Sequence, residues 1–438
     1  MTPEWIGIIS VTSLFILLCF GIPVGVALGL IGFFGLLLTS GLDTAFAIVQ
    51  TLPYSVVGNY SWAVLPLFVL MGTMAGSSGM TDDLFEVAKT WLGRLRGGLY
   101  LAVTWGSAAF GAVSGSTIVN AVVFTRLALP QMMQQGYSRA LSIGCIASAG
   151  TFAAMIPPSL TMVIYCMITE VSLGKLMIAG IGPGILTAIN YSLFILIFVR
   201  LKPSLAPTTA LEDYSLKEKI FSLRRSWSII IMIILVFGGI WGGFFAPSAA
   251  GAVGAFGVFI IALFKLGPKG NWIKEALKSS ASVSCIIFTI LIGGLIFSRF
   301  LALQGVITQC VEFITASISS GIGLIILFGI LYLVMGCLID TASMMVITLP
   351  FIFPLVQNYQ IDPIFFGILF VKMIEISTLT PPVGLNLYAA VSAAGKDMNM
   401  KEATMGVLPF IGVEAVTMIE LVMFPQLSLW LPNTMLGQ

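Results

Sequence analysis

The sequence predicts an all-α polytopic membrane protein whose two halves are related by an internal repeat. Three observations support this fold class: an apolar composition, apolar runs long enough to cross a bilayer, and prolines that recur at one spacing. Of the 438 residues, 58% are hydrophobic and 9% are charged, whereas soluble domains carry about 25% charged residues. So few charges could not cover the surface of a soluble fold, and the mean hydropathy of +1.07 agrees.

The same composition excludes several classes of site. A net charge of +2 is too small for a basic nucleic-acid surface, and the absence of histidine removes imidazole bases and histidine-containing zinc sites. The cysteines are scattered without a CxxC pair, so we expect them to pack as small apolar side chains. No organic cofactor and no transition metal is expected. Residues 1–20 contain Glu4 but no lysine or arginine, which favours a retained helix over a signal peptide.

Apolar runs follow one another along nearly the whole chain. A helix needs about 20 apolar residues to span the hydrocarbon core. Runs such as 46–79 and 321–357 are longer than one span and contain Gly and Pro, which is typical of helix pairs and of broken or re-entrant helices. The polar stretch 201–225, with Pro203 and Pro207, is interpreted as a linker between two halves.

Basic residues gather in three clusters, which the positive-inside rule predicts to face the cytoplasm. The clusters are Lys89, Arg94 and Arg96; Arg200, Lys202, Lys217, Lys219, Arg224 and Arg225; and Lys265, Lys269, Lys274 and Lys278. Counting spans between these clusters gives an odd number in each half, about 1–200 and 226–430. Odd numbers of spans invert the second half relative to the first, which is the signature of an inverted repeat.

A shift of 224 positions superimposes the prolines of the two halves and supports the repeat. The shift also places Thr117 on Thr341. A simple helix bundle with coincidental prolines is the alternative. The matched pairs are Pro23 with Pro247, Pro130 with Pro354, Pro157 with Pro381, and Pro158 with Pro382.

Two motifs in the first half predict broken helices. The sequence GAVSGST at 111–117 surrounds a glycine with small polar residues, and apolar residues then lead back to Pro130. We interpret it as a helical hairpin whose tip offers carbonyls and hydroxyls to a desolvated cation; a small-residue packing face is the alternative. Pro157 and Pro158 remove two backbone donors within another apolar run, which predicts an unwound helix facing that tip.

The second half repeats both motifs, with a hairpin tip at 336–343 and an unwound helix at 377–386. Asp340 and Glu375 are acids inside these apolar runs, and a carboxylate within a membrane is a candidate functional group. Asp340 could instead cap a helix N-terminus, and Glu375 could pair with Lys372. Segments 81–96 and 305–319 are expected to be amphipathic surface helices.

Taken together, these motifs resemble the large membrane subunit of a tripartite ATP-independent periplasmic (TRAP) transporter over essentially the whole chain. The matching pieces, in order, are GAVSGST at 111–117, P-x-M-x-x-x-G-Y at 130–137, IPPS at 156–159, PGIL at 183–186, G-x-x-x-D at 336–340, P-x-x-x-P at 350–354, ID-P-x-x-F-G at 361–367 and TPPVGLNLY at 380–388.

The resemblance implies an inverted-repeat, elevator-type transporter of the bacterial inner membrane, with two re-entrant hairpins and two unwound helices. It would carry an organic acid anion such as a C4-dicarboxylate or sialic acid in symport with sodium. A small four-helix membrane subunit and a periplasmic substrate-binding protein would be its partners. The implied division is scaffold at 1–96, transport domain at 97–175, helix and linker at 176–225, scaffold at 226–320, transport domain at 321–400 and a final helix at 401–438.

The resemblance also assigns ligands by motif position. One sodium is expected at Ser114, Ser116, Gly150 and Ala153, the last two through their carbonyls. A second sodium is expected at Gly336, Asp340, Ser377 and Thr380. The anionic substrate is expected near Thr151, Pro158, Thr341 and Asn386, where backbone donors of half-helix N-termini would help to bind its carboxylate.

Three other interpretations compete with this one. A stand-alone sodium- or proton-coupled carrier of related architecture would need no binding protein. A membrane-embedded enzyme is disfavoured because Asp340 has no evident second aspartate and the chain has no histidine. A non-transporting scaffold subunit would have no use for the unpaired carbonyls of broken helices.

Overall fold

The computed structural model describes residues 2–207, 214–268, 271–337, 339–382, 384–395 and 398–436. Within these residues it contains helices and no strand. Among the described residues, seven helices are long and apolar enough to cross a membrane, or eight if the bent pair Arg139–Met155 and Leu160–Thr169 forms one span. The prediction of an all-α polytopic membrane protein is therefore confirmed. Lys269, Leu338 and Val383, which belong to predicted motifs and clusters, lie outside the described residues.

The first half begins with a group of helices that precede the first hairpin. These are α1 (Pro3–Cys19), α2 (Val24–Ser40), α3 (Leu42–Val57), the 3-10 turn η1 (Tyr60–Ala63), α4 (Val64–Ser77) and α5 (Met80–Leu92). The hairpin, the broken helix and a long helix follow. These are α6 (Gly98–Ser114), α7 (Thr117–Gln134), α8 (Arg139–Gly150), α9 (Phe152–Met155), α10 (Leu160–Thr169) and α11 (Leu173–Leu201).

The linker contains short helical turns, and the second half then repeats the order of the first. The linker turns are η2 (Pro203–Leu205), α12 (Leu216–Ser222) and η3 (Leu223–Ser226). The next helices are α13 (Trp227–Ile233), the π-turn η4 (Ile234–Gly238), α14 (Gly239–Trp241), α15 (Pro247–Leu266), α16 (Trp272–Leu303) and α17 (Val306–Ser317). The last are α18 (Gly321–Met335), α19 (Thr341–Asn358), α20 (Pro363–Leu379), α21 (Leu385–Ala394), α22 (Met400–Met423) and α23 (Gln426–Leu436).

The repeat seen in the sequence is also present in the helix boundaries. Helices α7 and α19, the second arms of the two hairpins, begin at Thr117 and Thr341, which are matched by the 224-residue shift. Helices α8 and α20 begin at Arg139 and Pro363, which the same shift matches. Helix α20 ends at Leu379, just before its proline pair, whereas α8 ends at Gly150 and the short helix α9 continues it to Met155, just before the first proline pair. The two predicted hairpins and two unwound helices are thus confirmed.

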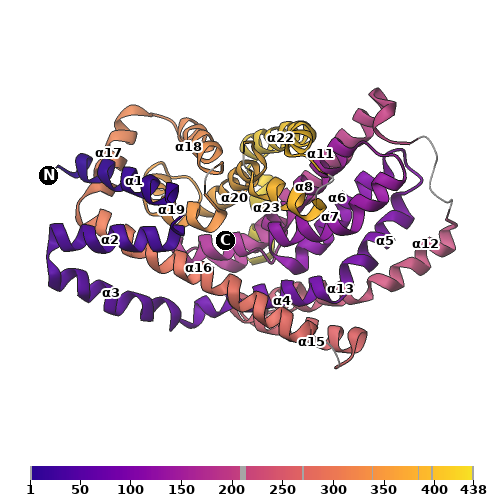
Figure 1. The fold of residues 1–438 in the computed structure, drawn as a ribbon, viewed down its shortest axis with the longest axis horizontal. Helices are drawn as coiled ribbons and strands as arrows, with labels where there is room; N and C mark the ends of the chain where they lie inside the picture. The colour runs from indigo at the N-terminus through magenta and orange to yellow at the C-terminus, as the bar shows by residue number, and fades with distance from the viewer. Residues whose placement is uncertain are drawn as a thin grey trace.

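Close glycine packing joins the two halves outside the hairpins. Helix α16, of 32 residues, crosses α2 so closely that a Cβ on Gly293 would lie 1.9 Å from the carbonyl oxygen of Gly25. Small residues permit such approach of helix backbones in membranes. In Figure 1, α2 and α3 lie at the left end, α16 runs from them toward the centre, and α5 and α12 lie at the right end. An ion pair between Asp83 of α5 and Lys265 of α15 also links the halves.

Candidate functional site

The N-termini of four half-helices meet around one cavity of about 260 Å³. Helices α7 and α19 begin there after the hairpin tips, and α10 and α21 begin there after the proline breaks. Helix N-termini carry a partial positive charge and unpaired backbone N–H groups. The polar lining consists of Ser116, Thr117, Thr161, Asp340, Thr341, Thr378 and Asn386.

Three of these N-termini are capped by side chains and one is not. Ser116 caps α7, Ser159 caps α10, and Asp340 caps α19 by accepting a hydrogen bond from the backbone N–H of Ser343 at 3.1 Å. The predicted alternative, that Asp340 is a helix cap, is therefore correct, although its capping does not test a role in cation binding. Helix α21 follows Gly384 and has no side-chain cap. Its first N–H groups therefore receive no hydrogen bond acceptor from a capping side chain.

Asn386, in the first turn of α21, has a polar side chain without a partner. The residue is 0% exposed, and neither Oδ1 nor Nδ2 makes a hydrogen bond. Buried polar groups are nearly always paired, because an unpaired one costs about 1–3 kcal/mol. Asn386 lines the cavity, so a ligand there would supply the missing partner for its amide.

The first hairpin tip contacts the first proline break. The backbone N–H of Leu160 donates to the carbonyl of Gly115 at 3.3 Å. Gly115 has φ +62°, and a Cβ on it would lie 2.8 Å from the carbonyl oxygen of Pro158, so glycine is required there. A Cβ on Gly111 of α6 would lie 3.1 Å from the backbone nitrogen of Ala153.

The predicted first sodium ligands therefore come from elements that touch one another. A Cβ on Gly150 would lie 3.1 Å from the carbonyl oxygen of Thr117 in α7, next to Ser116. Ser114 is buried, and its hydroxyl makes no hydrogen bond. Ser116 lines the cavity, whereas Ser114, Gly150 and Ala153 lie behind it and outside its lining.

The second tip and break meet in the same way. A Cβ on Gly336 would lie 2.3 Å from the Cβ of Ser377, and the thiol of Cys337 donates to the carbonyl of Pro381 at 3.5 Å. The Thr380 hydroxyl donates to the carbonyl of Ile376 at 2.7 Å. The structure thus brings the second tip and the unwound helix together, with Asp340 at the cavity.

Only some of the predicted substrate residues line the cavity. Thr341 and Asn386 line the cavity, and the Pro158 carbonyl lies beside the tip glycine Gly115. Thr151 is buried, donates to the carbonyl of Ser148 at 2.7 Å, and does not line the cavity. The proline break is responsible, because it turns α9 away from the start of α10.

Comparison with known proteins identifies the family. The sequence profile of the "Tripartite ATP-independent periplasmic transporter, DctM component" matches residues 11–427. The chain belongs to the DctM family. It is 31% identical to the C4-dicarboxylate TRAP transporter large permease protein DctM of Vibrio cholerae, over 98% of each chain. It is also 28% identical to the sialic acid TRAP transporter large permease protein SiaM of Vibrio cholerae, over 96% of this chain and 97% of that one.

A more distant DctM-family relative and one solved structure extend the comparison. The ectoine TRAP transporter large permease protein TeaC of Halomonas elongata is 26% identical over 97% of this chain and 98% of its own. The YdaH transporter of Alcanivorax borkumensis has a similar fold, with a TM-score of 0.62, 14% identity and 90% of each chain covered. These relatives are transport permeases, so the DctM-family chain is a transporter component and not an enzyme.

One wall of the cavity in this DctM-family chain was not predicted from the sequence. Helix α16 contributes an apolar surface opposite the hairpin tips, formed by Val283, Ile286, Ile287 and Ile290. Helix α16 carries no glycine–proline break, so its sequence gives no signal of proximity to the tips. A larger cavity of about 420 Å³ lies between α1 and α2, but its lining is almost wholly apolar and offers few ligands for an ion.

A second feature, predicted only in part, is a buried ionic network centred on α20. Lys372 pairs with Glu375 at 2.9 Å and with Glu414 of α22, and these side chains are at most 1% exposed. The predicted pairing of Glu375 with Lys372 is therefore confirmed. Sequence reasoning missed Glu414, although an acid inside the apolar run 403–431 was a usable signal.

Proposed function

We propose that this chain takes up an organic acid anion across the bacterial inner membrane in symport with sodium. The observation that carries the proposal is the cavity at which four half-helix N-termini converge on the unpaired amide of Asn386. A substrate-binding protein in the periplasm would deliver the anion, and a small membrane subunit would complete the scaffold. The family membership supports both partners, because it describes one component of a tripartite periplasmic transporter.

The electrostatics of the cavity favour an anion next to α21. The other three N-termini at the cavity are satisfied by Ser116, Ser159 and Asp340. A carboxylate at the uncapped N-terminus of α21 would accept from its free N–H groups and from Asn386 Nδ2. The names of the relatives, which transport C4-dicarboxylate, sialic acid and ectoine, support a small organic substrate with an acidic group.

The oxygen atoms behind the cavity favour sodium as the coupling ion. Sodium is a hard cation, and broken helices offer it carbonyl and hydroxyl oxygens. Ser114, Ser116, Gly150 and Ala153 would hold one ion at the first tip. Gly336, Asp340, Ser377 and Thr380 would hold a second ion at the other tip, with Asp340 supplying negative charge.

An elevator mechanism is consistent with the apolar surface of α16. Hairpins and broken helices would move together as the transport domain, while α2, α4, α15 and α16 remain as scaffold. The α16 wall offers Ile286, Ile287 and Ile290 to the moving tips. Such a surface has no polar partner to lose when the tips slide past it.

The test is uptake by reconstituted protein. The chain would be placed in liposomes with its small subunit and binding protein, and uptake of radiolabelled organic acids measured with and without an inward sodium gradient. Uptake that needs both sodium and the binding protein supports the proposal. Uptake by this chain and sodium alone would instead support a stand-alone symporter, and uptake without sodium would overturn the coupling.

Two substitutions locate the sites in the same assay. Asp340→Asn removes the carboxylate charge but retains a helix-capping oxygen, so the sodium concentration for half-maximal uptake should rise. Asn386→Ala should raise the substrate concentration for half-maximal uptake at saturating sodium. If Asp340→Asn leaves the sodium dependence unchanged, the second sodium site is wrong.

A further inference from the structure

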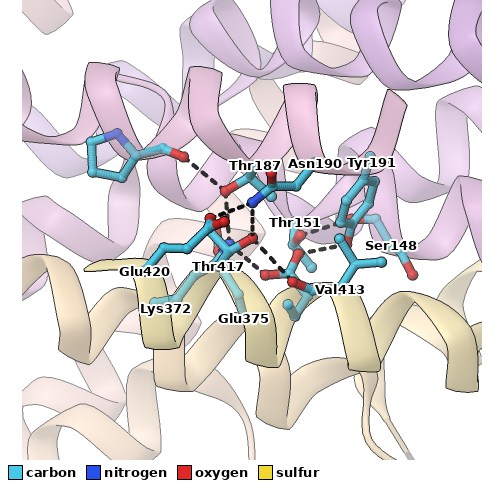
Figure 2. Close-up of polar contacts among 12 residues, drawn as sticks. Ser148, Thr151, Thr187, Asn190, Tyr191, Lys372, Glu375, Val413, Thr417 and Glu420 are labelled. Carbon is cyan, nitrogen blue, oxygen red and sulfur yellow. Dashed lines mark hydrogen bonds and ion pairs between the residues drawn. The ribbon is translucent and has the colours of Figure 1, made fainter. Parts of the chain in front are cut away.

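The buried network around Lys372 ties three helices from both halves together. The ammonium of Lys372 on α20 contacts the Thr187 hydroxyl of α11 at 3.0 Å and pairs with Glu414 of α22. The Tyr191 hydroxyl of α11 donates to the other carboxylate oxygen of Glu414. Figure 2 shows Thr187, Tyr191, Lys372 and Glu375 gathered between the helices of this region.

Burial makes this network a strong constraint on helix position. Lys372 and Glu414 are both 0% exposed in the middle of an apolar protein. Removing one partner of a buried ion pair leaves an uncompensated charge and is strongly destabilising, whereas replacing the whole group by neutral side chains is often tolerated. Any rotation or slide of α20 that separates Lys372 from Glu414 is therefore opposed.

The network has no ionic counterpart in the first half. The 224-residue shift matches Lys372 with Ser148 and Glu375 with Thr151. Further along the chain the offset is 226, which pairs Gly180 with Gly406 and matches Glu414 with Ala188. The first broken helix is held by backbone packing instead. A Cβ on Gly144 of α8 would lie 2.2 Å from the carbonyl oxygen of Gly406 in α22.

The anchored helix leads directly to the second hairpin contact. Glu375 lies about one turn after Lys372 on α20, and its carbonyl accepts a hydrogen bond from the Thr378 hydroxyl at 2.9 Å. Ser377 follows Glu375 by two residues and touches Gly336 at the tip. A helix rises about 1.5 Å and turns about 100° per residue, so a small rotation of α20 at Lys372 would carry Ser377 away from Gly336.

We propose that Lys372, with Glu414 and Tyr191, is a positioning group that sets the sodium affinity of the second hairpin site. The inference rests on the proposed function, because it assumes that sodium binds near Ser377 and Asp340. The ionic anchor holds the register of α20, and the register decides whether the Gly336 and Ser377 oxygens face one ion. None of the three anchor side chains touches the ion.

The experiment uses Cys337, which lies at the second tip against the Pro381 carbonyl and is partly exposed. The remaining cysteines would be replaced, and the chain with its small subunit would be purified in lipid nanodiscs. The rate of maleimide reaction at Cys337 would be measured against sodium chloride, with choline chloride keeping ionic strength constant. Sodium should slow the reaction by ordering the tip, and the half-protecting concentration reports sodium affinity.

Three variants separate positioning from folding. Lys372→Met leaves the buried carboxylates of Glu375 and Glu414 without a cation, so this variant risks misfolding. The deciding variant is therefore the neutral triple Lys372→Met, Glu375→Gln, Glu414→Gln. The triple variant should retain the melting temperature of the parent but need about tenfold more sodium for half-protection. Glu420→Gln is the control, because Glu420 accepts from Asn190 at 2.6 Å and makes no ion pair with Lys372.

The outcomes distinguish this inference from the proposed function. If sodium does not change the rate of maleimide reaction at Cys337 in the parent protein, the second sodium site is wrong, and this inference is wrong with it. A parent that responds to sodium, beside a stable triple variant with the same half-protecting concentration, overturns only the positioning role. A tenfold shift in the triple variant with no shift in Glu420→Gln supports it.

Discussion

Gly336 packs against the Ser377 side chain across the second hairpin tip, since a Cβ on Gly336 would lie 2.3 Å from the Cβ of Ser377 and 2.5 Å from its hydroxyl oxygen. In the first half, the tip glycine Gly115 makes a similarly close contact with the Pro158 carbonyl, although the repeat does not match these two residues with Gly336 and Ser377. Each hairpin tip thus rests on the unwound helix that the repeat pairs with it. In both cases glycine permits the approach.

Gly336→Ala should push the second tip away from the unwound helix. No Cβ fits within 2.5 Å of Ser377, so we expect a severe loss of sodium-driven uptake, on the order of tenfold or more, with the protein still folded, because overpacking typically costs about 1–3 kcal/mol. Uptake in proteoliposomes measures this effect. Gly329→Ala on the same hairpin arm is the control, because a Cβ there meets nothing within 4 Å. Equal uptake by the two variants would contradict the contact.

Gly144→Ala should destabilise the whole protein. The added Cβ would lie 2.2 Å from the carbonyl carbon and oxygen of Gly406. These two atoms belong to the backbone of α22, which cannot move aside as a side chain can. We expect a loss of about 1–3 kcal/mol or more, seen as a lower melting temperature in detergent. Gly412→Ala on α22 is the matched control, since a Cβ there meets nothing within 4 Å and alanine favours the helix.

Asn386→Leu should raise stability and abolish uptake. The Asn386 amide is buried and makes no hydrogen bond to the protein, so its replacement by an apolar side chain of similar size removes a cost of about 1–3 kcal/mol. The same change removes the proposed carboxylate donor. Asn120→Leu is the contrasting control, because Asn120 is also buried but is paired with Ser107 through both amide atoms. If Asn386→Leu lowers the melting temperature as Asn120→Leu should, the inference that the Asn386 amide makes no hydrogen bond within the protein is wrong.

Ser114→Ala should weaken sodium dependence without harming the fold. The Ser114 hydroxyl is buried and unpaired, so nothing in the sodium-free protein loses a hydrogen bond. We expect the sodium concentration for half-maximal uptake to rise about tenfold, as the loss of one ligand worth about 1.4 kcal/mol would give. Ser142→Ala, which changes another buried and unpaired serine on α8 away from the tips, should leave the sodium dependence unchanged. A shift of equal size in both would remove Ser114 from the ligand set.

Local rules made much of the fold predictable from the sequence. The membrane class follows from hydropathy, and the hairpin tips follow from small polar residues at 114–116 and 336–343. The prolines at 157–158 and 381–382 cannot donate backbone hydrogen bonds, so they end α9 and α20 wherever those helices pack. The pairing of Lys372 with Glu375 is local too, because residues three apart share a helix face.

The apolar sequence of this chain by itself determined a two-fold repeated set of broken helices that must lie in a membrane. Tertiary structure alone decided that the N-termini of α7, α10, α19 and α21 meet at one cavity, and that α16 closes it. It also brought Glu414 to Lys372 and kept Thr151 away from the cavity. The physical reason is that breaks and spans are properties of short segments, whereas a shared cavity or a buried ion pair depends on the packing of helices far apart in the chain.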